Sequence, residues 1–105
     1  MESSFRILWV DNDPYALSRL KAALPAGFEV LAAANPSTLK KLIAGQPMDL
    51  TLVDPWQDEH GKLTFQSWLL DADLPKPFVV LTTIHDPEKN RMLQDMGAIE
   101  FLSKS

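Results

Sequence analysis

The sequence predicts an α/β protein in which a doubly wound, parallel sheet of five strands carries helices on both faces. Short apolar runs of four to six residues recur along the whole chain, as strands buried in a parallel sheet do. Between these runs, apolar residues recur at intervals of three and four, which is the period of an amphipathic helix. Strands and helices that alternate at this spacing predict right-handed crossovers between parallel strands.

The first predicted strand is the apolar run Phe5–Val10, which only Arg6 interrupts, so we expect it at the centre of the sheet. A helix follows it, because Asp13 can cap the helix and Pro14 suits the first turn. Pro25 ends this helix. Its apolar stripe consists of Leu17, Leu20 and Leu24.

The second strand, Phe28–Ala33, leads into a helix that begins in the same way, with Asn35 followed by Pro36. Gly45 ends this helix, because glycine readily takes the left-handed conformation found after a helix. Its apolar stripe consists of Leu39, Leu42 and Ile43. The third strand is then Met48–Val53.

The second half of the chain repeats the pattern after a polar loop, Pro55–Gly61. We expect a helical stretch that ends before Pro75, a fourth strand at Phe78–Leu81, and a fifth at Ile99–Leu102. A further helix begins at residues 86–87 with an aspartate and a proline. The apolar residues of the two helices are Leu63, Phe65, Trp68, Leu69 and Leu70 in the first, and Met92, Leu93 and Met96 in the second.

The 105 residues are predicted to form a single domain, residues 1–105, that lacks the final helix of a doubly wound sheet. The chain ends at Ser105, directly after the fifth strand, so part of the sheet face beside the first helix would expose apolar surface. Two explanations stay open. Either the chain is an excised fragment, or another chain, such as an output domain or a second copy, covers that face.

Composition excludes several classes of function. The formal net charge of −4, without a cluster of basic residues, argues against direct contact with nucleic acid. Cysteine is absent, and His60 and His85 are the two histidines, so a zinc site is not expected. The sequence has neither a signal-peptide pattern nor an apolar run long enough to cross a membrane. We therefore expect a cytoplasmic protein.

Polar side chains follow several predicted strands at the point where each strand ends. Asp11 and Asp13 follow the first strand and Asp54 follows the third, while Thr82 and Lys104 close two others. The carboxyl ends of parallel strands meet at one crevice, so these side chains are expected to converge. Carboxylates there suit Mg²⁺, and a carboxylate nucleophile with a metal, a hydroxyl and a lysine suffices for phosphoryl transfer. Asp54, Thr82 and Lys104 would fill these protein roles.

Over essentially its whole length the chain resembles a response-regulator receiver domain of two-component signalling. The resemblance is carried by ILWVDNDP at 7–14, LTLVDP at 50–55, VVLTT at 79–83 and GAIEFLSKS at 97–105, in that order. It implies a flavodoxin-like fold with strand order 2-1-3-4-5. It also implies a phosphoprotein that works in phosphorelay signal transduction and whose only catalysis is its own phosphorylation and dephosphorylation.

The resemblance further implies which residues take part and which proteins interact with the domain. Asp54 would be phosphorylated by a sensor histidine kinase or a phosphotransfer protein, and Thr82 and Lys104 would bind the phosphoryl group. Mg²⁺ would be held by Asp11, Asp54 and the backbone carbonyl of Trp56. Phosphorylation would then switch a surface that binds a partner or forms a dimer.

This sequence departs from the family pattern in the residues around the expected site. Asn12 stands where a second metal-ligating acid is expected, so it offers an amide oxygen, removes one negative charge and weakens the Mg²⁺ site. The loop after Asp54 is one residue shorter than expected and lacks its usual proline. Ser105 follows Lys104 where a proline is common.

Two other functions remain as alternatives. In the first, Asn12 and the altered loop have removed the metal-dependent chemistry, and the domain serves for protein interaction or dimerisation. In the second, Asp11 and Asp13 are the nucleophile and the general acid of a haloacid-dehalogenase-like phosphohydrolase. The second alternative leaves Asp54 without a role.

Overall fold

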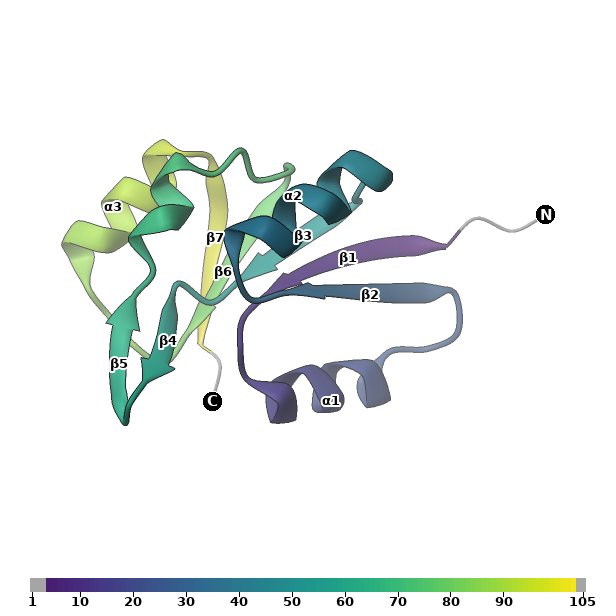
Figure 1. The fold of residues 1–105 in the computed structure, drawn as a ribbon, viewed down its shortest axis with the longest axis horizontal. Coiled ribbons are helices and arrows are strands. Elements are labelled where there is room, and N and C mark those ends of the chain that lie inside the picture. Colours follow the sequence, from purple (N-terminus) through teal and green to yellow (C-terminus); the bar gives the residue numbers. More distant parts are fainter. Residues whose placement is uncertain (1–3, 104–105) are drawn as a thin grey trace.

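The computed structural model describes residues 4–103, and its centre is a five-stranded parallel sheet (Figure 1). The order across the sheet is β2-β1-β3-β6-β7, and every neighbouring pair is parallel. The predicted α/β class and the five-stranded parallel sheet are therefore confirmed. The five strands are β1 (Phe5–Val10), β2 (Phe28–Ala33), β3 (Leu50–Val53), β6 (Phe78–Thr82) and β7 (Ala98–Ser103).

Helices cover both faces of this sheet, but unequally (Figure 1). Helix α1 (Pro14–Ala23) lies on one face, below β1 and β2 in the figure, whereas α2 (Pro36–Gly45) and α3 (Pro87–Asp95) lie on the other face, α2 above these strands and α3 to the left of β6 and β7. A short 3₁₀ helix, η1 (Ser67–Asp71), lies on the same side as α2 and α3. The main core forms on that upper side, from residues that include Leu8, Val10, Leu39, Val53, Leu69, Phe78, Val80 and Leu93.

The three α-helices begin where the sequence predicts, and side-chain caps explain why. Asp13 accepts hydrogen bonds from the backbone N–H groups of Tyr15 and Ala16 at the start of α1. Asn35 caps α2 and Asp86 caps α3 in the same way, and each of the three caps is followed by a proline in the first turn. These side chains satisfy backbone donors that have no partner within the helix.

Between β3 and β6 the predicted loop is wrong, and the predicted helical stretch is confirmed only in its second half. Residues 56–65 form an antiparallel hairpin of β4 (Trp56–Glu59) and β5 (Lys62–Phe65), and the only helical segment there within residues 4–103 is η1. The turn explains the difference. His60 and Gly61 both have positive φ, 56° and 82°, as the two central residues of a tight hairpin turn require. The Asp58 carboxylate also accepts the N–H of Gly61, which fixes the turn.

The edge strand β7 carries apolar side chains in solvent. Ile99 is 65% exposed and Leu102 is 49% exposed, although both belong to a strand of the central sheet. Phe5 and Phe28, at the start of β1 and β2, are also partly exposed and pack edge to face against each other. No helix within residues 4–103 is both long and apolar enough to cross a membrane.

Candidate functional site

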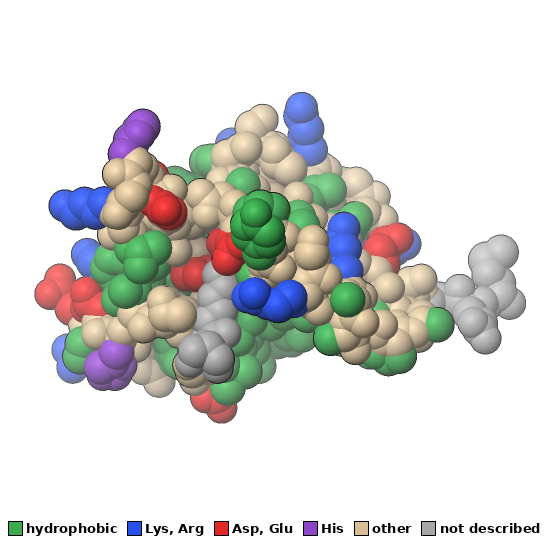
Figure 2. All heavy atoms as spheres, turned by 90° about the horizontal axis from the view of Figure 1, so that it is seen from below, with side chains coloured by type: hydrophobic (Ala, Val, Ile, Leu, Met, Phe, Trp, Pro, Cys, Tyr) green, Lys and Arg blue, Asp and Glu red, His purple; other side chains and the backbone are tan. Residues whose placement is uncertain are grey.

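An open pocket of about 780 Å³ lies at the carboxyl ends of β1 and β3. Its lining comes from the loop between β1 and α1, the residue after β3, the β4–β5 hairpin, two residues of α1 and one residue after β6. Seen from below, the molecule shows acidic side chains near the centre of this face (Figure 2). The lining residues are Asp11, Asn12, Asp13, Pro14, Arg19, Asp54, Trp56, Asp58, His60, Gly61, Leu63 and Thr83.

The sheet itself brings Asp11 and Asp54 together. Val10 and Val53 are paired in the parallel ladder between β1 and β3, and each is followed directly by one of the two aspartates. The backbone N–H of Asp54 donates to the carbonyl of Val10 over 2.9 Å, which holds the two chain segments side by side. Both aspartates are buried, with 6% of Asp11 and 5% of Asp54 exposed. Two carboxylates thus lie in one pocket, as the strand-end argument predicts.

Local hydrogen bonds orient these two carboxylates. One oxygen of Asp54, Oδ1, accepts the backbone N–H of Trp56 over 2.9 Å, and Oδ1 of Asp11 accepts the N–H of Asp13 over 3.2 Å. Hydrogen bonds between an aspartate side chain and the backbone N–H two residues later stabilise a turn. They also fix the orientation of the carboxylate. Trp56 also lines the pocket, and its ring packs edge to face on Phe65 with ring centroids 5.3 Å apart.

The structure separates the two threonines at the end of β6. Thr82 is not among the residues that line the acidic pocket. Its hydroxyl oxygen accepts the backbone N–H of Ile84 over 3.0 Å, and it borders a different hollow of about 220 Å³, together with Asn90 and Phe101. Thr83, which the sequence argument did not select, lines the acidic pocket. Lys104, the other residue expected to bind the phosphoryl group, lies outside the described residues.

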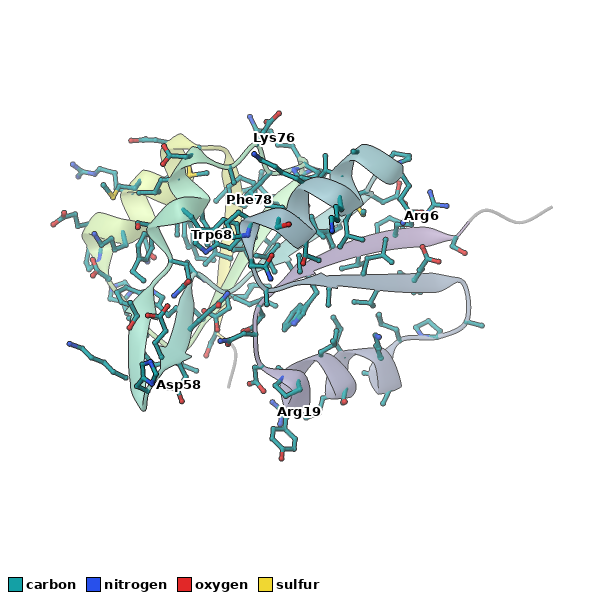
Figure 3. All side chains as sticks on the ribbon, in the orientation of Figure 1. Arg6, Arg19, Asp58, Trp68, Lys76 and Phe78 are labelled. Atoms are coloured by element: carbon teal, nitrogen blue, oxygen red, sulfur yellow. The ribbon has the colours of Figure 1, made fainter. Side chains whose placement is uncertain are left out.

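Sequence reasoning also missed the side chains that α1 and the hairpin contribute. Arg19 on α1 and Asp58 on β4 both line the pocket, and both lie on the lower side of the molecule in Figure 3. His60 lines the pocket as well, from the hairpin turn. The sequence feature that indicates the hairpin is the His-Gly pair at 60–61, because glycine favours a tight turn. It lies between two four-residue segments that each contain polar and apolar residues. For Arg19 the sequence carries no local signal, because its position depends on how α1 packs.

The oxygen atoms of the side chains that line the pocket are of the kind that bind a hard divalent cation. Mg²⁺ usually binds one or two carboxylates and completes its shell with water and phosphate oxygens. The side chains of Asp11, Asp54 and Asn12 provide two carboxylates and an amide oxygen. Across residues 4–103 no cluster of three or more histidine, aspartate or glutamate side chains has the arrangement of a metal site built from protein ligands alone.

Negative charge dominates the pocket. Four aspartates line it, at 11, 13, 54 and 58, against one guanidinium, that of Arg19. Like charges that share a partly buried site repel by about 3 kcal/mol at a separation of about 5 Å and an effective dielectric constant of about 20. A phosphate that enters this pocket therefore needs cations or hydrogen-bond donors around it.

No family model matches this sequence, and a search of curated proteins finds none similar to it.

Proposed function

We propose that this chain is a phosphoacceptor domain of the receiver type, in which Asp54 accepts a phosphoryl group from an acyl phosphate or from a phosphohistidine of a partner protein. The observation that carries the proposal is the position of Asp54. It is buried at the carboxyl end of the middle strand, beside Asp11 of the adjacent strand, in a pocket open to solvent. The sheet order, in which β6 and β7 serve as fourth and fifth strands, supports a flavodoxin-like arrangement.

The transfer step needs a nucleophile and a donor in line. A carboxylate oxygen of Asp54 attacks phosphorus, and the bond from phosphorus to the oxygen or nitrogen of the donor breaks. The leaving group, acetate or imidazole, keeps the electron pair of that bond, and Asp54 becomes an acyl phosphate. In dephosphorylation, water attacks phosphorus and the bond between phosphorus and the Asp54 oxygen breaks, which restores the carboxylate and releases inorganic phosphate. Positioning and charge neutralisation supply most of the catalysis in such transfers.

The residues that would hold a divalent cation are Asp11, Asp54, the amide oxygen of Asn12 and the backbone carbonyl of Trp56. A bound Mg²⁺ would neutralise charge on the phosphoryl oxygens and reduce the repulsion among the carboxylates. The chain itself orients the nucleophile, because the N–H of Trp56 holds one oxygen of Asp54 and the main chain of β1 holds its backbone.

A second candidate function is a receiver-like domain that binds partners without phosphorylation. Asn12 favours this second function. It places a neutral, exposed amide beside Asp11 and Asp54, where a third carboxylate would bind a cation more strongly. Asp13 argues against the phosphohydrolase. Its carboxylate accepts two backbone N–H groups at the start of α1, so it serves as a helix cap rather than a general acid.

Intact mass spectrometry after incubation with acetyl phosphate and Mg²⁺ tests the proposal. The wild-type chain should gain the mass of one phosphoryl group, and Asp54→Asn should not. Asp58→Asn is the matched control, because it removes another carboxylate of the same pocket without removing the acceptor, and it should still be labelled. Labelling that persists in Asp54→Asn would refute the assignment, and label located on Asp11 would favour the phosphohydrolase.

A further inference from the structure

A second hollow, of about 480 Å³, lies between α2 and the η1 segment, and we refer to it as the α2–η1 groove. Its lining comes from α2 and from residues 68–73. The groove is open because the connection from β3 to β6 forms a hairpin and a short 3₁₀ segment, so that a full helix does not lie beside α2 at this place. The groove and the acidic pocket have no lining residue in common.

The floor of the α2–η1 groove is apolar. Leu39 belongs to the hydrophobic core and is 2% exposed, whereas Ile43, Trp68 and Ala72 are partly buried and pack against that core. The residues that α2 contributes recur at intervals of three and four, so one stripe of the helix faces the groove. Trp68 lies beside α2 (Figure 3). Small-molecule sites are mostly apolar and have volumes of about 300 to 1,000 Å³, so this groove has the size and the lining of such a site.

Charged side chains border the groove. Asp71 and Asp73 contribute two carboxylates and Lys40 contributes one ammonium group, and all three residues are exposed. The one salt bridge within residues 4–103 joins Arg6 and Glu29, so no cation in that part of the chain neutralises the two carboxylates. Negative charge therefore exceeds positive charge at the rim, and a cationic ligand complements it better than an anionic one.

We propose that the α2–η1 groove binds a small organic amine that has an apolar or aromatic body and one ammonium group. The body occupies the apolar floor between Leu39 and Trp68, and the ammonium group lies at the rim with Asp71 and Asp73. Burial of the body supplies most of the affinity, because exposed charge pairs contribute little. The carboxylates select for a cation, and a tryptophan suits this choice because its ring attracts ammonium groups. This binding does not depend on phosphorylation of Asp54.

Titration of the full chain, followed by two-dimensional NMR, tests the proposal with three probes. Phenethylamine carries a phenyl ring and an ammonium group, hydrocinnamate carries the same ring with a carboxylate, and methylammonium has the charge without the ring. We expect phenethylamine to shift the indole N–H signal of Trp68 and to bind about threefold or more tightly than hydrocinnamate does. Methylammonium should leave the Trp68 signal unchanged. A shift confined to the indole of Trp56, which lines the acidic pocket, would overturn the proposal.

Substitutions in the groove provide the matched comparison. Ala44→Phe adds a large side chain to the groove from an exposed position of α2, so it should abolish binding of phenethylamine. The double variant Asp71→Asn with Asp73→Asn should weaken binding of phenethylamine by about threefold or more, without weakening that of hydrocinnamate. Glu88→Gln with Asp95→Asn is the control, because it removes two carboxylates of α3 that do not line the groove. Its affinity should equal that of wild type.

Two further results would contradict the proposal. If phenethylamine and hydrocinnamate bind equally well, or if the double variant at 71 and 73 binds phenethylamine as wild type does, the groove does not select a cation. If phenethylamine shifts no signal of α2 or of residues 68–73, the groove is not its site. Labelling of Asp54 by acetyl phosphate is measured separately, so failure of the phosphoacceptor function and failure of amine binding are distinguished.

Discussion

Individual side chains at the strand ends carry the chemistry proposed for this chain, and Asn12 is the one whose identity most limits it. Asn12 lines the pocket next to Asp11, in the loop between β1 and α1. Its side chain is exposed, so a carboxylate there would not be buried. An added negative charge at this point would attract a divalent cation to the acid pair.

Asn12→Asp should therefore lower the Mg²⁺ concentration needed for half-maximal labelling of Asp54 by several-fold, because the added charge strengthens attraction for the cation. The measurement is the rate of labelling by acetyl phosphate as a function of Mg²⁺ concentration. Asn90→Asp is the control, because Asn90 lies on α3 and borders the other hollow. An identical Mg²⁺ dependence in wild type and Asn12→Asp would show that residue 12 does not take part in cation binding.

The residues of the site differ in how far the sequence alone reveals them. Asp11 and Asp54 are predicted because each ends an apolar run, and parallel strands bring such ends together. Thr83 is not predicted. To choose between two adjacent threonines one must know which face of the sheet each residue points to, and a shift of one residue moves every side chain to the opposite face. Arg19 is not, because its place in the pocket depends on the packing of α1 against the sheet.

Among the secondary-structure elements, the β4–β5 hairpin is the one that sequence reasoning missed. The apolar residues from Leu63 to Leu70 have a spacing compatible with a helix, whereas residues 62–65 form a strand that pairs with residues 56–59. The strands of the central sheet and the helices that begin with an aspartate or asparagine cap followed by proline agree with the prediction, with some strand ends shifted by one or two residues. Short hairpins carry a weaker signal because each strand has only four residues.

The turn of this hairpin depends on the glycine at its second central position. Gly61 has φ of 82°, and apart from its chain neighbours no atom lies within 4 Å of the place where a Cβ would be, so the penalty for alanine is conformational rather than steric. Gly61→Ala should destabilise the fold by about 1 kcal/mol. Gly45→Ala is the control, since Gly45 lies in α2 without a positive φ and has equal space around it.

Urea unfolding of the two variants and of wild type measures this difference. Gly45→Ala should be neutral or slightly stabilising, because alanine favours a helix more than glycine does. A Gly61→Ala variant as stable as wild type would mean that the tight turn is not maintained in solution.

In the molecule as a whole, the larger hydrophobic core lies on the side of the sheet that carries α2, α3 and η1. The short η1 segment is part of that core, because Leu69 within it is fully buried. Trp68 and Phe78 also lie in this upper layer (Figure 3). The connection from β3 to β6 therefore contributes to stability through η1 and to the pocket through the hairpin.

Truncation of Leu69 should reveal this contribution. Leu69→Ala should lower the free energy of unfolding by about 3 kcal/mol, because a fully buried leucine leaves a cavity when it is shortened. Leu63→Ala, on β5, should cost less than about 1 kcal/mol, since Leu63 is 45% exposed. Chemical denaturation of both variants provides the comparison. Equal losses in the two would contradict the placement of η1 in the core.

The pocket draws its parts from two separate sheets, and this has a mechanical consequence. Asp11 and Asp54 directly follow strands of the central ladder, whereas Asp58 belongs to a two-stranded ladder that shares no pairing with it, and His60 lies in the turn of that hairpin. The spacing of the acid pair is therefore fixed by the pairing of β1 with β3, whereas the hairpin fixes the direction of the Asp54 carboxylate through the N–H of Trp56. A substitution in the hairpin turn can thus change the lining of the pocket without breaking a main-chain bond of the central ladder.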